Sequence, residues 1–169
     1  MIIRLAEDKD IEQITAIYNR AIQAGNATAD LDLLSPKQGR KRFRNTKPDR
    51  YPIYVLETEN KIVGWGSLKP YRPGRRALDE AAEITYYIDY DYHGNGYGKA
   101  LIAYMVSDCK RLKINYLLAF LLEVNHASAG ILKRFGFQKW GFFPDIANLC
   151  GKRSGHLVYG KALEAHNGS

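Results

Sequence analysis

Three glycines within seven residues join an apolar strand to an amphipathic helix, and this segment constrains the fold more than any other. It reads His93-Gly94-Asn95-Gly96-Tyr97-Gly98-Lys99 and follows an apolar run that ends at Ile88. Glycines let the main chain approach a ligand closely and leave N–H groups pointing outward. The N-terminus of the next helix adds its partial positive charge. The segment therefore predicts a site for a phosphate or pyrophosphate group, with Lys99 at its rim.

Spacing excludes the two commonest nucleotide-binding loops. A Walker A loop requires Ser or Thr after Gly98-Lys99, where this chain has Ala100, and a glycine at the position of His93. A Rossmann fingerprint that began at Gly94 would require a glycine in place of Lys99. A different phosphate-bearing ligand is expected.

The rest of the chain predicts one mixed α+β domain. Strands are expected at 2–6, 53–57, 62–68, 83–88, 116–122, 137–140 and 156–162. Helices are expected from Asp8 or Asp10, from Ser35-Pro36, from the glycine-rich segment to about residue 113, and over 126–135. The order is β-α-α-β-β-β-α-β-α-β-β, with an antiparallel first half and a strand–helix–strand unit in the second. The domain is expected to span residues 1–163, and the small polar residues 164–169 are expected to form a disordered tail.

Composition narrows the class of protein. No apolar run is long enough for a membrane span, and an acidic cluster follows the first residues where a signal peptide would stay apolar. We therefore expect a cytoplasmic protein without membrane contact. The two cysteines lack a CxxC spacing and the four histidines are scattered, so neither a disulfide framework nor a metal site is expected.

The net charge of +7 is concentrated in residues 37–50 and 72–76. A basic chain can bind nucleic acid or a phosphorylated small molecule. No nucleic-acid-binding motif accompanies these runs. The default interpretation is therefore that they are solvated surface, and if they bind a ligand, an anionic small molecule is favoured. An acceptor that carries a carboxylate would suit Arg72, through bidentate pairing, although a basic surface loop is an equally good interpretation.

The glycine-rich segment resembles motif A of the GCN5-related N-acetyltransferases, with the pattern Arg/Gln-x-x-Gly-x-Gly/Ala. His93 stands at the Arg/Gln position. The resemblance covers the chain from Ile2 to about Leu163 and is strongest to the phosphinothricin acetyltransferase branch, which acylates the α-amino group of amino acids and their analogues. The matching stretches are Ile17-Tyr18-Asn19, Tyr51-Pro52-Ile53-Tyr54-Val55, Val63-Gly64-Trp65-Gly66, Asn125-His126-Ala127-Ser128 and Phe135-Gly136-Phe137.

This resemblance implies a fold and a set of site residues. The fold would be a single domain with a mixed central sheet of six to seven strands, helices on both faces and splayed central strands that form an acyl-CoA cleft. Glu83 matches the proposed general base and would also contact the acceptor. Acetyl-CoA would be the donor, without a metal, and the branch implies a homodimer. The donor would be bound by Tyr86, Tyr87, Ile88, His93, Gly94, Asn95, Gly96, Tyr97, Gly98, Lys99, Asn125 and Ser128.

The chemistry agrees with these residue types. An α-ammonium must lose a proton before it attacks a thioester, and a carboxylate can accept that proton directly or through water. Other interpretations remain open at this point. Glu83 could be a polar residue on an exposed strand face, and Asn125 could only cap the following helix. The acceptor could instead be a peptide, a protein or an antibiotic-type amine. The chain could also be a CoA-binding module without turnover, or could bind nucleic acid through residues 37–50.

Four positions depart from the family pattern. His93 replaces the usual Arg or Gln of motif A. Leu132 stands where many relatives carry a tyrosine general acid, which this branch often lacks. Ser154 and Gly155 replace an aromatic and an acidic residue near the C-terminus. The last change predicts an acceptor different from that of the branch, if those positions shape the acceptor pocket.

Overall fold

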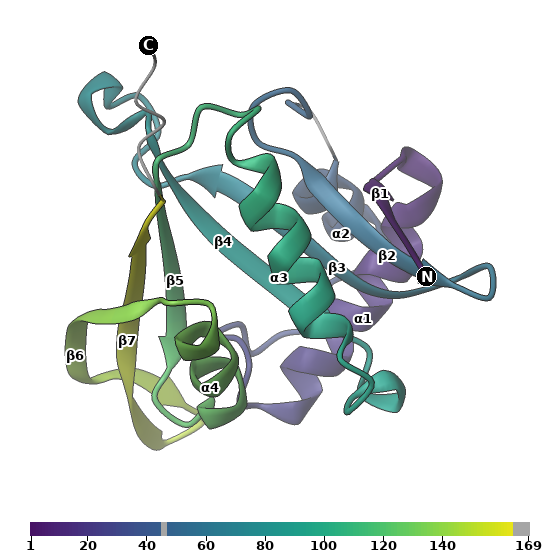
Figure 1. The fold of residues 1–169 in the computed structure, drawn as a ribbon. Helices are drawn as coiled ribbons and strands as arrows, with labels where there is room; N and C mark the ends of the chain where they lie inside the picture. The colour runs from purple at the N-terminus through teal and green to yellow at the C-terminus, as the bar shows by residue number, and fades with distance from the viewer. Residues whose placement is uncertain (45–46, 164–169) are drawn as a thin grey trace, which may run out of the picture.

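A seven-stranded mixed sheet organises the computed structural model, which describes residues 1–44 and 47–163. The strand order is β1-β2-β3-β4-β5-β7-β6 (Figure 1). The strands are β1 Ile2–Leu5, β2 Ile53–Thr58, β3 Lys61–Pro70, β4 Ala81–Ile88, β5 Tyr116–Leu122, β6 Gln138–Leu149 and β7 Lys152–Ala162. The helices are α1 Ile11–Ala24, α2 Pro36–Phe43, α3 Tyr97–Asp108 and α4 His126–Arg134. This is the expected element order, and the tail predicted for 164–169 lies outside the described residues.

Helices cover both faces of the sheet, and each face has its own core. In Figure 1, α3 and α4 lie in front of the sheet while α1 and α2 lie behind it. The core under α3 joins Ile102 and Met105 to alternate residues of β2 and β4. The core under α1 joins Ile14 and Trp65 to the other faces of β2 and β3. Because successive side chains of a strand point to opposite faces, each of these strands contributes side chains to two separate hydrophobic layers.

Local signals place the first elements as the sequence predicts. Ser35 caps α2, because its hydroxyl accepts from Gln38 N while the Gln38 side chain accepts from Ser35 N in a capping box. Glu59 and Asn60 have φ values of 51° and 58°, which gives the two-residue turn that joins antiparallel strands. The turn joins β2 to β3, which pair antiparallel, and the other edge of β3 pairs with β4.

The central strands β4 and β5 separate after three residue pairs. They run parallel, and their register pairs only Ala81 with Tyr116, Ala82 with Leu117 and Glu83 with Leu118. Beyond Glu83, no strand of the described residues pairs with the edge of β4 that faces β5. This is the splay that the resemblance implied, and it opens the middle of the sheet toward the N-termini of α3 and α4.

The bounds of three elements, α3, β6 and β7, differ clearly from the prediction. α3 ends at Asp108, not near residue 113, although Cys109 and Leu112 remain buried in the turn that follows. β6 and β7 are much longer than the predicted strands 137–140 and 156–162. A register irregularity between Phe143 and Ala147, with φ of 52° at Asp145, interrupts the alternation in β6. Because a bulge breaks the period of two, the sequence beyond residue 140 does not look like a strand.

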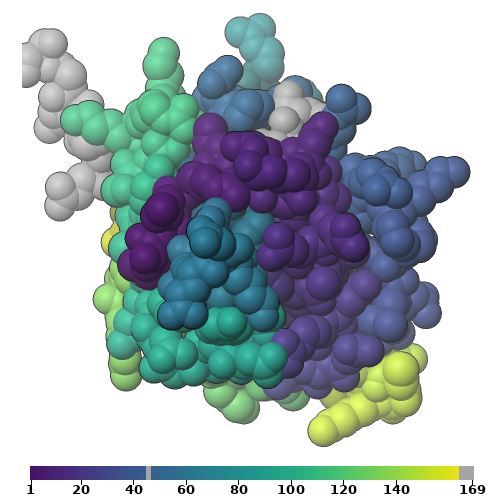
Figure 2. Space-filling view, turned by 90° about the vertical axis from the view of Figure 1, so that its right-hand side faces the viewer, coloured from purple at the N-terminus to yellow at the C-terminus, as the bar shows by residue number. Residues whose placement is uncertain are grey.

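The β6–β7 hairpin leaves large apolar side chains exposed. Phe143 is 49% exposed and Ile146 62%, together with Trp140 and Phe142. Figure 2 shows the yellow-green end of the hairpin projecting from the body of the molecule. No helix within the described residues has both the length and the apolar character that a membrane span requires.

Candidate active site

The glycine-rich turn leads directly into α3 and leaves space above it. Gly94 and Gly96 have φ values of 84° and 78°, in the left-handed region that favours glycine. Gly96 is the N-cap of α3. A Cβ added at either glycine would meet no heavy atom within 4 Å. The main-chain groups of this turn therefore border open space, as an anion-binding helix N-terminus requires.

This space belongs to a cleft of about 510 Å³ between β4 and the first turns of α3 and α4, which we call the glycine-turn cleft. Asn95 is the one predicted donor-binding residue that does not line it. The Asn95 side-chain amide donates instead to the carbonyl oxygens of Tyr92 and His93, at 3.1 and 3.4 Å, and so holds the turn. The predicted residues that line the cleft are Tyr86, Tyr87, Ile88, His93, Gly94, Gly96, Tyr97, Gly98, Lys99, Asn125 and Ser128.

Two of these side chains have local structural roles. The Nε2 of His93 lies 2.9 Å from the carbonyl oxygen of Ile88, and its ring stacks on Tyr90 at 4.6 Å. The ring is thereby held against the end of β4. The Asn125 side-chain oxygen accepts from Ser128 N at 3.2 Å, which makes Asn125 the cap of α4. Capping and contact with a ligand are compatible, because Asn125 also lines the cleft.

A second cavity, of about 380 Å³, lies on the opposite face of β4, and we call it the Glu83 pocket. Successive side chains of a strand point to opposite faces. Thus Glu83, Thr85 and Tyr87 face this pocket, whereas Tyr86 and Ile88 pack against the core under α3. Ala27 and Tyr87 line both cavities, so the two spaces meet beside the splayed strand. The Tyr87 hydroxyl donates to the Ala27 carbonyl oxygen at 3.5 Å across this junction.

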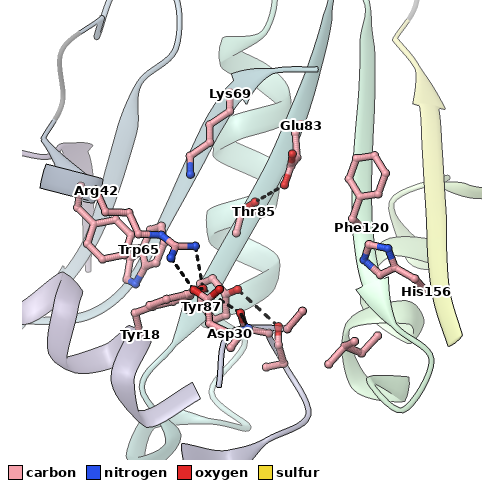
Figure 3. Close-up of a pocket in the computed structure, with 15 residues that line it drawn as sticks. Tyr18, Asp30, Arg42, Trp65, Lys69, Glu83, Thr85, Tyr87, Phe120 and His156 are labelled. Carbon is pink, nitrogen blue, oxygen red and sulfur yellow. Dashed lines mark hydrogen bonds and ion pairs between the residues drawn. The ribbon is translucent and has the colours of Figure 1, made fainter. Parts of the chain in front are cut away.

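Glu83 lies where the pairing of β4 with β5 stops. It is half-buried, and its Oε1 accepts from the Thr85 hydroxyl at 3.4 Å. Among the described residues no Lys, Arg or His nitrogen lies within 4.0 Å of its carboxylate. Figure 3 shows Glu83 pointing into the pocket between β4 and the side chains from β5 and β7. A carboxylate in this position is available to accept a proton from a bound molecule.

Three side chains that line the Glu83 pocket, those of Tyr18, Asp30 and Arg42, form a hydrogen-bonded network. Arg42 donates to Asp30 at 2.5 Å and to the Tyr18 hydroxyl at 3.0 Å, and its guanidinium lies 4.7 Å from the centre of the Tyr18 ring. The Tyr18 hydroxyl in turn donates to Asp30 at 2.6 Å. Burial, and then the hydrogen bond to Asp30, raise the pKa of Tyr18 to about 12. The positive charge of Arg42 is therefore matched by Asp30.

Two further titratable side chains line the pocket, Lys69 on β3 and His156 on β7. Burial lowers the pKa of His156 and so favours the neutral ring, although the negative charge of Glu83 acts in the opposite direction. The pKa of Lys69 is also lowered, first by desolvation and then by the charge of Arg42. None of Arg42, Lys69 and His156 was predicted as a site residue. A prediction of the strand register, which pairs Lys69 with Glu83, could have identified Lys69 as a residue near the site.

Arg72, the predicted contact for an acceptor carboxylate, is not among the residues that line the Glu83 pocket. It is exposed in the loop after β3, and its guanidinium lies 5.5 Å from the centre of the Tyr71 ring. Tyr71 stacks on Phe120, which does line the pocket. A substrate role for Arg72 stays a prediction. Within the described residues no cluster of His, Cys, Asp and Glu is arranged to hold a metal ion.

Comparison with known proteins identifies relatives over nearly the whole chain. The model of the acetyltransferase (GNAT) family matches residues 11–137. YwnH of Bacillus subtilis, a protein whose name proposes a phosphinothricin acetyltransferase, is 35% identical over 164 residues, which are 96% of this chain and 99% of that protein. The L-methionine sulfoximine/L-methionine sulfone acetyltransferase of Pseudomonas aeruginosa is 29% identical over 157 residues, or 89% of this chain and 87% of that protein.

A solved structure shares the fold. The crystal structure of a GNAT superfamily phosphinothricin acetyltransferase from Sinorhizobium meliloti, in complex with acetyl-CoA, superposes with a TM-score of 0.88 at 24% identity. The match covers 96% of this chain and 88% of that one. The seven-stranded sheet and its four helices are therefore an arrangement that recurs in a solved acetyltransferase structure.

Proposed function

This chain belongs to the acetyltransferase (GNAT) family, and on that premise we propose that it transfers an acetyl group from acetyl-CoA to the amino group of a small amino-acid-like molecule. The acceptor class is taken from relatives named for phosphinothricin and for methionine sulfoximine and sulfone. The observation that carries the proposal is the meeting of two cavities at Ala27 and Tyr87, one beneath the glycine-rich turn and one around Glu83. A donor and an acceptor could thus approach one another from opposite faces of the same strand.

The glycine-turn cleft suits the donor. The outward N–H groups of residues 94–99 would bind the pyrophosphate, aided by the helix N-terminus. The edge of β4 beyond Glu83 has no strand partner, so the main-chain groups of residues 86–88 would bind the pantetheine arm as an added strand does. Asn125 and Ser128 line the same cleft and would contact the coenzyme from α4.

Glu83 would act as the general base. Its carboxylate would take a proton from the acceptor ammonium, directly or through a water molecule. The free amine would then form the new N–C bond to the acetyl carbonyl carbon while the C–S bond breaks and the thiolate leaves. The second proton that the nitrogen loses as the amide forms would pass to water. A main-chain N–H of β4 would stabilise the oxyanion in the transition state. Leu132, at the position where many relatives carry a tyrosine, cannot donate a proton, so the thiolate would leave unprotonated or take a proton from water.

The size and lining of the Glu83 pocket support a small acceptor. Its volume is about 380 Å³, near the lower end of the 300–1,000 Å³ range of small-molecule sites. The Arg42–Asp30–Tyr18 network contributes polar groups to its lining. A pocket of this volume and polarity suits a small polar acceptor.

A homodimer belongs to the same proposal. Exposed apolar patches that include residues such as Phe143 and Ile146 are typical of interaction sites. A second copy of the chain would cover the exposed face of β6.

The test is a screen of acetyl-CoA consumption, with thiol release as the readout. The acceptors would be free amino acids, their sulfone and sulfoximine analogues and small amines without a carboxylate. We expect turnover with at least one amino-acid-like acceptor. Turnover with none of these acceptors, while acetyl-CoA still binds, would contradict the proposal and favour a CoA-binding module.

A further inference from the structure

Lys69 and Glu83 place opposite charges side by side at one end of the Glu83 pocket. They are Cα partners in the antiparallel register of β3 and β4, and directly opposite residues of such a pair have Cβ atoms about 4.5–5.5 Å apart on the same face of the sheet. Figure 3 shows both side chains directed into the same pocket from neighbouring strands. Within the described residues, no carboxylate lies within 4.0 Å of the Lys69 ammonium, that of Glu83 included.

The other charged groups of the pocket do not compete for this role. Arg42 is paired with Asp30 and hydrogen-bonded to Tyr18. His156 is driven toward its neutral form by burial. Among the described residues that line the pocket, Lys69 is therefore the one lysine or arginine without an ion-pair partner. Glu83 is likewise the one lining carboxylate without such a partner.

We propose that Lys69 binds the carboxylate of an α-amino-acid acceptor and thereby sets the acceptor's amino group toward Glu83. This inference rests on the proposed function. An α-amino acid carries its ammonium and its carboxylate on one carbon, so its two charges are as close together as those of neighbouring side chains on adjacent strands. Glu83 would receive the ammonium and Lys69 the carboxylate, and the side chain would extend toward the Arg42 end.

Desolvation supports the assignment. Lys69 is exposed as a whole residue, but desolvation is the largest cause of the lowered pKa of its ammonium, and no carboxylate of the described residues lies close enough to form an ion pair with it. The carboxylates of Glu83 and Asp30 act on it only at a distance, and Arg42 opposes them. A bound carboxylate would supply the missing counter-charge through a charge-assisted hydrogen bond.

The experiment compares two acceptors and five proteins. The acceptors are an amino acid that the wild-type enzyme acetylates and the same amino acid as its carboxamide, which keeps the amine but lacks the negative charge. The proteins are wild type, Lys69→Met, Lys69→Arg, Arg72→Met and Lys110→Met. Lys110 is exposed beyond the end of α3 and lines neither cavity. Thermal unfolding and acetyl-CoA binding of each variant establish that the fold and the donor site are intact.

We expect Lys69→Met to lower kcat/KM for the amino acid by about 10- to 100-fold, mainly through KM, with little change for the carboxamide. Lys69→Arg should recover most of the loss, and Lys110→Met should resemble wild type. An equal effect of Lys69→Met on both acceptors, or none on either, would overturn the assignment. A selective loss in Arg72→Met with none in Lys69→Met would also overturn it and place the carboxylate at the loop after β3.

The failure of this inference differs from that of the proposed function. If wild type acetylates amino acids and Lys69→Met changes nothing, only the assignment to Lys69 is wrong. If wild type acetylates only amines that lack a carboxylate, the transferase activity stands and the Lys69 assignment falls. If wild type acetylates no amine, both fall together.

Discussion

The Glu83 carboxylate accepts a hydrogen bond from the hydroxyl of Thr85, two residues further along the same strand, at 3.4 Å. The two side chains project from the same face of β4 into the Glu83 pocket. Among the described residues, the second carboxylate oxygen of Glu83 has no hydrogen-bond partner. A neutral donor on one side and an open pocket on the other suit a group that is to exchange a proton.

Replacing Glu83 by Gln should reduce kcat with little effect on acetyl-CoA affinity. General-base catalysis typically contributes about 10²- to 10⁴-fold, so we expect a loss of at least 100-fold in steady-state turnover. Glu80→Gln is the matched control, because Glu80 lies three residues earlier, is exposed, and accepts from the Asn115 side chain at 2.8 Å outside the pocket. Equal turnover in Glu83→Gln and Glu80→Gln would remove Glu83 as the base.

Replacing Gly96 by Val should weaken the binding of acetyl-CoA. The new side chain would adopt a left-handed backbone at a cost of about 1–3 kcal/mol and would project into the glycine-turn cleft. Gly74→Val is a close control, because Gly74 has the same φ of 78°, is equally open, and lies in the loop after β3. Both variants should lose similar stability, and only Gly96→Val should raise the dissociation constant, about tenfold or more, in calorimetry. Similar constants for the two variants would argue against the pyrophosphate site.

Replacing Asp10 by Asn should destabilise the fold in a pH-dependent way. Burial alone would raise the pKa of Asp10, but hydrogen bonds from Arg4 and from the Glu7 amide outweigh it, and the net pKa is lowered. A carboxylate with a lowered folded-state pKa stabilises the protein above its unfolded pKa of about 3.9, and this contribution is lost as pH falls through the folded value. We expect a loss of about 1–3 kcal/mol at pH 7, toward the lower end because Arg4 is partly exposed.

Urea unfolding at several pH values measures this effect. The difference between wild type and Asp10→Asn should stay constant from about pH 5 to 8 and shrink below about pH 4. Asp8→Asn, two residues earlier and exposed, should show a much smaller difference. A difference for Asp10→Asn that did not change with pH would contradict the ionic origin of the contact.

Replacing Phe143 by Glu should disrupt the proposed dimer. Phe143 is 49% exposed on β6, and a charge in a buried apolar contact is strongly unfavourable. Sedimentation of wild type should give the mass of two chains, and that of Phe143→Glu the mass of one. Leu31→Glu is the control, because Leu31 is 52% exposed in the loop before α2. A monomeric wild type, or a dimeric Phe143→Glu, would show that this face of β6 does not join two copies.

The parts of the site that lie close together in sequence were the parts that sequence could predict. The segment from Gly94 to Lys99 forms a turn whose conformation follows from its own glycines, and all predicted donor residues except Asn95 line one cleft. Glu83 required the family resemblance, since a glutamate in a strand carries no distinctive pattern. The general-base role itself stays a prediction.

The other side of the pocket could not be predicted, because its residues come from distant elements. Arg42 lies in α2, within a basic run for which solvated surface was the default interpretation, and His156 lies in a strand paired with β5. Lys69 faces Glu83 only through the register of β3 and β4. The length of β6 was missed for a local reason, the irregularity around Asp145. Two causes therefore explain what the sequence did not predict: the pocket residues meet only in the folded chain, and the periodicity of β6 is interrupted.

The three residue pairs between β4 and β5 also have a mechanical consequence. They join the two halves of the sheet at one end only, so the far end of the seam depends on whatever lies between the strands. A ligand that forms hydrogen bonds to the main chain of β4 there would help to hold the two halves of the sheet together. Amide hydrogens of β4 beyond Glu83 should then exchange more slowly in the presence of acetyl-CoA, while those of β2 and β3 on the far side should change little.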